Sequence, residues 1–412
     1  MHVPASVDSA GGIRPGLHKS TLILCLLFGS FFCLYTVSLP VFADGFVSSL
    51  IFGSDDMLAA YQGGRGRNLM DKHPLFIIVS GLYWAAGRLF SWAPAELAQN
   101  LRMVFPVALL GAIAVCVAYR VFLRSGANNE QAVSFAVLYG ISGTTWLFSS
   151  FPETYILTAL CTNVFLWFIL QTPKERVARY INRAAILNAV ACLASPQQVL
   201  LSIAPFVRWL TEGQGLSTLI RKCVRYAAAM LVLYFIPYEI YLKAVGKGWR
   251  FGPVYLHVYG QLKHLLEVRT IVVVAANFLL YSVVPPAVTP RSFTDPTFSI
   301  VRLFSPEWIV VSILFLGWCV YSLRGLRGSP AIKPAAAMAA FVCSYILFFV
   351  YFNPSEAYLY TAPALLPWLL LLQAGFCSRW NRFRRGALWV MIVAIVINNA
   401  QFRIYLQSIK RR

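Results

Sequence analysis

Long apolar runs recur along almost the whole chain of 412 residues and leave little sequence for a water-soluble core. Several of them reach the ~20 residues that a helix needs to cross the hydrocarbon layer of a bilayer. Because only helices and closed barrels satisfy their backbone polar groups in lipid, these runs predict an all-α, polytopic transmembrane protein. Counting short and broken segments, we expect roughly ten to thirteen of them by this length criterion. The runs are residues 20–43, 74–92, 101–122, 131–149, 152–171, 184–207, 226–245, 270–288, 306–323, 334–352, 358–376 and 386–402.

Charge is scarce and unbalanced in this chain. Only 12% of the residues are charged, about half of the share usual in soluble domains. Basic residues outnumber acidic ones by 35 to 15, which gives a net charge of +20. They lie mainly between the apolar runs, where the positive-inside rule and anionic headgroups account for most of them. No zinc-finger spacing or basic helix stands out, so we expect membrane lipid as a partner and no nucleic acid. The nine cysteines are scattered without any CxxC pair, which disfavours disulfides and a zinc site.

The basic segments predict an orientation. Residues 173–183 and 377–385 each carry four basic side chains and should be cytoplasmic, as should the loop at Arg120 and Arg124. The tight turns at 150–153 and 353–356 then face the external side. We expect an integral protein of a bacterial inner membrane with a cytoplasmic N-terminus.

This orientation divides the chain around one transmembrane domain, residues 20–402. The expected parts outside the spans are a cytoplasmic tail (1–19), a first external loop carrying short surface helices (45–73), a long loop region (246–305) and a basic C-terminal tail (403–412).

Two apolar runs depart from a regular span. Two full crossings between the first external loop and Arg124 would put that arginine on the wrong side, so segment 74–92 is predicted to lie on the surface or to re-enter, unless the charge rule fails locally. Segment 184–207 is interrupted by Ser195-Pro196-Gln197-Gln198. Proline removes a backbone donor and breaks a helix, and such a break is tolerated at membrane depth only against protein or a water-filled cavity.

The scarce carboxylates gather on the predicted external face. Asp55 and Asp56 are adjacent in the first external loop, where one could act as a base or both could hold a divalent cation. The alternative is a helix cap, because Ser54 or Asp55 could cap a helix that starts near Met57. Glu153 and Glu356 precede predicted spans, where the helix dipole alone could account for them.

Further polar residues accompany these carboxylates. His73-Pro74 marks the beginning of a helix, and Lys72, Arg65, Arg67 and Arg102 could hold a phosphate or contact headgroups. Ionisable residues at membrane depth are functional candidates, and a common face strengthens that interpretation.

In this order of motifs the chain resembles the GT-C superfamily of membrane glycosyltransferases, in particular the branch of protein O-mannosyltransferases and the aminoarabinose transferase of lipid A. The matching features are an acidic pair after the first span, a His-Pro motif, an arginine before a span rich in small residues, a basic turn, an acidic external turn and a broken helix. They correspond here to Asp55-Asp56, His73-Pro74-Leu75, Arg102, Arg120 with Arg124, Glu153 and Ser195-Pro196-Gln197. The chain has His-Pro-Leu where the family has His-Pro-Pro, and it lacks the lysine of the broken helix.

The resemblance implies a GT-C-like fold and transfer of a sugar from a polyprenyl-phosphate-linked donor to a hydroxyl of a glycan, lipid or protein acceptor. Asp55 would be the base and Asp56 would support it or help hold a cation; no other cofactor is implied. Residues that would contact the donor or acceptor are His73, Lys72, Arg102, Glu153, Tyr155, Gln197, Glu356 and Tyr358. The alternatives are a transporter or flippase of a lipid-linked or small polar substrate, and a non-catalytic membrane scaffold. A transporter would be expected to show two related halves, and no matching pair of interrupted helices is found.

Overall fold

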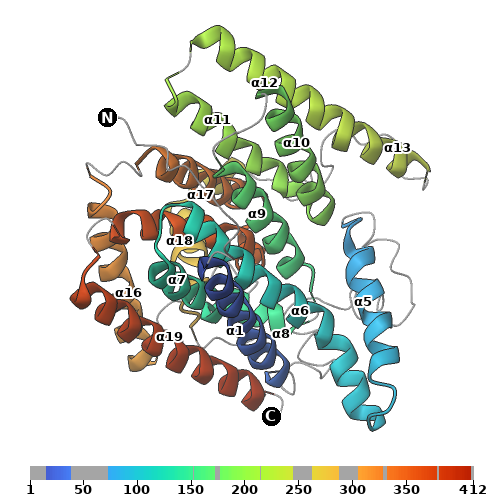
Figure 1. The fold of residues 1–412 in the computed structure, drawn as a ribbon, viewed down its shortest axis with the longest axis vertical. Coiled ribbons are helices and arrows are strands. Elements are labelled where there is room, and N and C mark those ends of the chain that lie inside the picture. Colours follow the sequence, from blue (N-terminus) through green and yellow to red (C-terminus); the bar gives the residue numbers. More distant parts are fainter. Residues whose placement is uncertain are drawn as a thin grey trace.

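The computed structural model describes residues 15–38, 73–151, 153–171, 177–213, 215–244, 262–286, 305–327, 332–377 and 380–409. All secondary structure in these ranges is helical (Figure 1). The apolar runs therefore form helices as expected. The prediction of an all-α, polytopic membrane protein is confirmed.

Within the described ranges, five helices are long and apolar enough to cross a membrane. They belong to α1 (Pro15–Val37), α6 (Ala95–Arg124), α16 (Pro306–Arg324), α17 (Ile332–Phe352) and α19 (Arg382–Ile409). Shorter apolar helices are α5 (Phe76–Leu89), α9 (Tyr155–Ile169), α15 (Val268–Ala276) with the π-helix η5 (Asn277–Tyr281), and α18 (Ala362–Cys377). The expected ten to thirteen segments are reached only when these shorter helices and one bent pair are counted.

The remaining helices include those on either side of two breaks in the helical chain. The bent pair consists of α7 (Asn129–Ile141) and α8 (Gly143–Ser150), and α10 (Val177–Ala194) is followed by the 3₁₀ helix η2 (Pro196–Ser202) and by α11 (Ile203–Thr211). Helix α12 (Leu216–Met230) continues through the π-helix η3 (Leu231–Phe235) into α13 (Ile236–Ala244), and both lie at the top of Figure 1. Two short 3₁₀ helices, η4 (Leu262–Leu265) and η8 (Pro354–Tyr360), complete the described elements.

Helices α1 and α6 run antiparallel against each other. The thiol of Cys116 donates to the carbonyl of Leu24 at 3.6 Å, and Phe32 packs edge-on against Phe105, with 5.8 Å between ring centroids. The start of α1 therefore lies beside the end of α6, as expected for an N-terminus on the same side as Arg124. Helix α5, which lies between α1 and α6 in the sequence, has only 14 residues, fewer than the ~20 that a helical span needs. These features support the prediction that segment 74–92 is an incomplete crossing.

The predicted break in segment 184–207 is confirmed. Helix α10 ends at Ala194, Ser195 is extended with φ −162° and ψ 123°, and Pro196 begins η2. Proline suits this first helical position, because its missing N–H would have no partner there. The polar break lies within the protein, since Ser195 and Gln198 are both buried.

A second break was not predicted, because residues 131–149 read as one continuous span. The chain bends by 60° between α7 and α8. At the bend, the N–H of Gly143 donates to the carbonyl of Val283 at 3.1 Å, and that of Thr144 donates to Ser282 at 3.0 Å. The amide of Asn399 in α19 donates to the carbonyl of Ile141 at 2.6 Å. Partners distant in the sequence thus satisfy the backbone groups that the bend releases.

The basic segments predicted to share one face do lie together. Arg124 donates to the carbonyl of Trp167 at 2.7 Å, which joins the ends of α6 and α9. Arg385 pairs with Glu130 at 3.1 Å, which joins the starts of α19 and α7. The hydroxyl of Ser125 also donates to Gln373 near the end of α18 at 2.8 Å. We call this end of the molecule the basic end.

Two helices extend into the predicted tails. Helix α1 begins at Pro15, five residues before the expected first span, and α19 continues to Ile409 beyond the expected end at 402. The expected surface helices of the first external loop lie outside the described residues, because the structure describes nothing between residues 38 and 73.

Candidate functional site

His73 and the broken helix, two separate features of the sequence, lie together. The Nδ1 atom of His73 is 2.7 Å from the carbonyl oxygen of Ala194, the last residue of α10. The N–H of Leu75 donates to the carbonyl of Leu193 at 3.0 Å. Because the last carbonyls of a helix have no partner within that helix, the start of α5 satisfies the end of α10. The His-Pro motif is therefore fixed against the break.

The glutamine pair after Pro196 faces two environments. Gln198 is fully buried, accepts from the hydroxyl of Thr162 at 2.9 Å and donates to the hydroxyl of Tyr345. Gln197, the residue predicted to bind substrate, is half-buried. Gln198 thus ties η2 to α9 and α17, and Gln197 is the glutamine with a partly exposed side chain.

The two predicted external turns also lie together. Tyr155 packs against Tyr360, with ring centroids 5.3 Å apart, and against Phe148 at 4.8 Å. Phe148 in turn lies 6.5 Å from Tyr358. The turn before α9 and the turn before α18 therefore form one aromatic cluster. We call this cluster, with Glu153, the turn cluster.

Aromatic contacts join the turn cluster to the broken helix. Tyr360 stacks on Phe349 at 4.6 Å, and Phe349 contacts Tyr345 at 5.6 Å. Tyr345 accepts the hydrogen bond from Gln198. A continuous line of contacts thus runs from His73, through the end of α10 and η2, to Tyr155 and Tyr358. It connects three of the sequence-predicted site residues, His73, Tyr155 and Tyr358, and Glu153 lies two residues before Tyr155. We call these residues and the contacts between them the connected region.

Glu153 is a carboxylate inside this region. It is 6% exposed, and its Oε2 accepts from the N–H of Thr154 at 3.3 Å. Its position just before α9 agrees with the expectation of a helix N-terminus, where the dipole favours negative charge. A buried carboxylate beside tyrosines can accept hydrogen bonds from the hydroxyl groups of a ligand.

Glu356 and Arg102 differ from their expected local settings. Glu356 lies within η8 rather than at the start of a span, because α18 begins only at Ala362. Arg102 lies about two turns inside α6 instead of preceding the span, because α6 begins at Ala95. The side chain of Glu356 lies outside the described residues.

Arg102 is held against the second half of α5, away from His73. Its guanidinium lies over the rings of Tyr83 and Trp84, at 4.1 Å and 4.7 Å from their centroids. A β-carbon on Gly87 would come within 2.8 Å of its Nε, so the glycine allows this close approach. Seven residues of α5 separate its first residue, Phe76, from Tyr83, which places Tyr83 about 10 Å along the helix from its start near His73. Arg102 therefore does not join the connected region.

Asp55, Asp56 and Lys72 lie outside the described residues, as do Arg65 and Arg67. Among the residues that are described, no group of three histidine, cysteine or acidic side chains could hold a metal ion. Asp55 and Asp56, the pair predicted to hold a divalent cation, are not among the described residues.

The long loop region contributes one acidic side chain with a shifted pKa. Glu267 precedes α15 and accepts from the hydroxyl of Thr270 at 2.8 Å. This bond, with the contact to His264 at 3.2 Å, holds the pKa of the carboxyl below its usual range. Glu267 is solvent-exposed and anchors the first turn of α15.

Gln198, Tyr345 and Tyr360 belong to the connected region but were absent from the sequence-predicted site. The Ser-Pro-Gln-Gln break pointed to this neighbourhood, but the sequence analysis did not single out Gln198, the buried glutamine that bonds Thr162 and Tyr345. Nothing in the local sequence distinguishes Tyr345 within the aromatic-rich α17, so only its contacts reveal it.

No protein-family model matches the chain, and no curated protein matches it by sequence. Solved structures match at the level of the fold. ArnT from Cupriavidus metallidurans in the apo state aligns over 90% of this chain with a TM-score of 0.51 and 14% identity, and this chain spans 62% of its length. ArnT bound to undecaprenyl phosphate aligns over 96% of this chain and 76% of its own, with a TM-score of 0.51 and 13% identity.

The archaeal oligosaccharyltransferase AglB from Archaeoglobus fulgidus, in complex with an inhibitory peptide and a dolichol-phosphate, aligns over 80% of this chain and 47% of its own, with a TM-score of 0.45 and 16% identity. The likeness to ArnT is a likeness of fold, and the prediction of a GT-C-like arrangement is confirmed at that level.

Proposed function

We propose that this protein is a membrane glycosyltransferase that moves a sugar from a polyprenyl-phosphate-linked donor to an acceptor hydroxyl on the external face. The observation that carries the proposal is the connected region from His73 to Tyr358, within a fold shared with a structure that holds undecaprenyl phosphate. The region joins the His-Pro motif, the broken helix and both external turns. The sugar and the acceptor are proposed to bind beside this region.

Asp55 is proposed as the base. Its carboxylate takes the proton of the acceptor hydroxyl while the hydroxyl oxygen forms a bond to the anomeric carbon. The bond between that carbon and the phosphate oxygen breaks, and the lipid phosphate leaves with the electron pair. Asp56 supports the base or helps to hold a divalent cation that would balance the phosphate charge.

Side chains of the connected region are proposed to bind the reactants. Glu153 accepts hydrogen bonds from sugar or acceptor hydroxyls, and the partly exposed Tyr155 presents a ring face to the sugar. The buried Tyr358 supports Tyr155 through Phe148. Gln197 offers a partly exposed amide beside them, and His73 and Glu356 line the same region. Lys72 supplies positive charge for the phosphate. Arg102, which stacks on α5, is proposed to act nearer to the lipid.

The product distinguishes a transferase from a transporter or flippase. The purified full chain is incubated with an undecaprenyl-phosphate-linked sugar and candidate acceptors, and free undecaprenyl phosphate is measured by mass spectrometry. A transferase releases lipid phosphate in proportion to glycosylated acceptor. Movement of intact donor across proteoliposomes without release would contradict the proposal.

The proposed base is tested by Asp55→Asn. Because a positioned general base contributes about 10²–10⁴-fold to rate, kcat should fall by at least about 100-fold. Asp71→Asn makes the same change in the same loop and should retain transfer within a few-fold. Membrane insertion and thermal unfolding are compared for both variants. Undiminished transfer by a normally inserted Asp55→Asn variant would refute the assignment.

A cation at the acidic pair is tested separately. Transfer is measured after treatment with EDTA and again after Mg²⁺ is restored. Activity that is lost with EDTA and recovered with Mg²⁺ would show that transfer needs a cation. A weaker response to Mg²⁺ in the Asp56→Asn variant would place that cation near Asp55 and Asp56. Activity that is indifferent to EDTA would assign the pair to proton transfer alone.

A further inference from the structure

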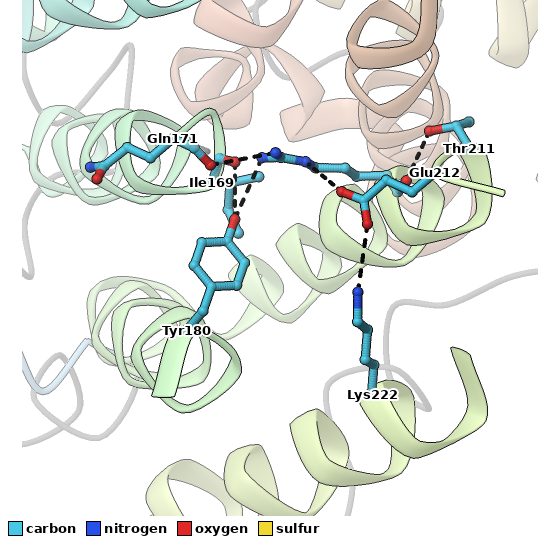
Figure 2. Close-up of polar contacts among 7 residues, drawn as sticks. Ile169, Gln171, Tyr180, Thr211, Glu212 and Lys222 are labelled. Carbon is cyan, nitrogen blue, oxygen red and sulfur yellow. Dashed lines mark hydrogen bonds and ion pairs between the residues drawn. The ribbon is translucent and has the colours of Figure 1, made fainter. Parts of the chain in front are cut away.

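A charged network fixes how α12 is attached to the rest of the protein (Figure 2). Arg208 on α11 donates to Glu212 at 3.3 Å, to the hydroxyl of Tyr180 at 3.5 Å and to the carbonyl of Gln171 at 3.4 Å. Glu212 also pairs with Lys222 on α12 at 3.5 Å. The network therefore joins the end of α9, the start of α10, α11 and α12. It lies on the basic-end side, since Gln171 follows α9 near Trp167.

The attachment sets which sides of α12 are buried. Lys222, Tyr226 and Met230 are buried against the protein. Asn188 on α10 donates to the hydroxyl of Tyr226 at 2.8 Å, and the amine of Lys222 lies 5.6 Å from the ring centroid of Trp209. These contacts fix the rotation of the helix about its own axis, so its other two sides face outward.

One outward side of α12 is apolar. Leu216, Ile220 and Val224 are 71%, 52% and 62% exposed. Residues four apart lie on one side of a helix, so the three form a stripe, which Leu231 continues into η3. Water would be an unfavourable neighbour for so much apolar area, whereas lipid acyl chains would be a favourable one.

The other outward side of α12 is basic. Arg221 and Arg225 are exposed, four residues apart and about 100° around the helix from the apolar stripe. Arg225 donates through Nε to Asn182 of α10 at 3.0 Å, which uses one of the five donors of its guanidinium. Arg179 and Arg183 extend the positive charge along exposed positions of α10.

Acidic residues are scarce in the sequence around these arginines. Glu212 is the only acidic residue between 177 and 225 in the sequence. It is already paired with both Arg208 and Lys222. The surface made by Arg179, Arg183, Arg221, Arg225 and the apolar stripe is therefore cationic and apolar at once. We call it the α10–α12 surface.

We propose that the α10–α12 surface binds anionic phospholipid headgroups at the membrane face of the basic end. The arginines contact the phosphates while Leu216, Ile220 and Val224 enter the adjacent acyl layer. A helix with neighbouring basic and apolar sides is suited to this boundary, and juxtamembrane arginines are attracted to anionic lipid. A soluble protein partner would not require the apolar stripe to lie beside a basic one. This site is separate from the connected region and does not depend on the proposed transferase activity.

The test measures lipid-dependent stability of the full chain in neutral detergent. Phosphatidylglycerol or phosphatidylcholine is titrated into the micelles, and the thermal unfolding midpoint is followed at each mole fraction. Phosphatidylglycerol should raise the midpoint more than phosphatidylcholine does. The difference should shrink as salt increases, because exposed charges are screened.

Charge variants identify the surface. Because one cation near an anionic membrane contributes about fivefold in binding, Arg221→Gln/Arg225→Gln should raise the half-saturating mole fraction of phosphatidylglycerol at least about fivefold. Arg88→Gln/Lys263→Gln removes two exposed cations elsewhere and should change it less than about twofold. Asn182→Ala removes the partner of Arg225 without changing charge and should also stay within about twofold.

The apolar stripe has its own variant. Ile220→Gln/Val224→Gln should weaken the response to both lipids, because it removes contact with the acyl chains and leaves the arginines in place. Equal midpoint shifts by the two lipids in the unaltered protein would overturn the proposal. So would equal losses in Arg221→Gln/Arg225→Gln and in its matched control.

Discussion

At the scale of single residues, substitutions of the two adjacent glutamines of η2 should have opposite effects on stability and on transfer. Gln198→Leu leaves the hydroxyl of Tyr345 without its buried donor and removes one of the two acceptors of the Thr162 hydroxyl. A buried polar group that loses its partner costs about 1–3 kcal/mol. Thermal unfolding in detergent should therefore show a clearly lowered midpoint for this variant.

Gln197→Leu serves as the matched control. Its side chain is only half-buried, so the unfolding midpoint should stay near that of the unaltered protein, while transfer should fall because Gln197 is proposed to bind substrate. A Gln197 variant that is as destabilised as the Gln198 variant would contradict this division of roles.

The same pair marks the limit of sequence reasoning at this scale. Pro196 predicts a break, and the structure has one. Which glutamine turns inward depends on the helix that follows the break, because successive residues of a 3₁₀ helix point about 120° apart. The direction of the chain after Pro196 is set by contacts with α9 and α17, which the local sequence does not reveal. Asp55 and Asp56, the residues on which the mechanism depends most, remain predictions from the sequence alone.

At the scale of elements, the junction between α7 and α8 depends on one glycine. A β-carbon on Gly143 would overlap the ring of Pro285, while its N–H is bonded to Val283. Gly143→Ala should therefore push the α7–α8 bend away from Pro285 and lower the free energy of unfolding by about 1–3 kcal/mol. Thermal unfolding should report a lower midpoint.

Gly317→Ala provides the comparison in α16. A β-carbon there meets nothing within 4 Å, and alanine favours a helix more than glycine does. This variant should be unchanged or slightly more stable. Equal destabilisation by both substitutions would show that close contact with Pro285 is not what makes Gly143 necessary.

This junction also explains why the bend escaped prediction. Residues 131–149 carry no proline, and their only local sign of a bend is the Ser142-Gly143 pair, a weaker helix breaker than proline. The bend is stabilised by Ser282, Val283 and Asn399, which are about 140 to 260 residues away in the chain. The break after Ala194 differs because its cause, Pro196, is local. Sequence therefore predicts a break when a nearby residue causes it and misses one that a distant partner stabilises.

At the scale of the whole molecule, pairing between distant helices brings the basic segments to one end, and the side of the membrane that this end faces stays a prediction. The antiparallel packing of α1 and α6 and the contacts of Arg124, Arg385 and Arg208 collect the basic segments at one end. Charge counts in the sequence sufficed to predict this grouping because each loop carries its own positive charge. The extent of α5 required the structure, because apolar composition alone does not distinguish a short helix from a full crossing.

The orientation predicts opposite accessibility for two exposed serines. Ser91 lies between α5 and α6, and Ser217 lies in the first turn of α12 beside the basic end. A membrane-impermeant maleimide added to intact cells should label Ser91→Cys and should label Ser217→Cys only after the cells are disrupted. The unaltered chain, whose native thiols are measured in parallel, sets the background. Labelling of both positions from the same side would mean that an even number of crossings separates them, which contradicts the predicted topology, and the reverse pattern would invert that topology. In that case the connected region around Glu153 would face the cytoplasm, and a transferase acting on the external face could not use it.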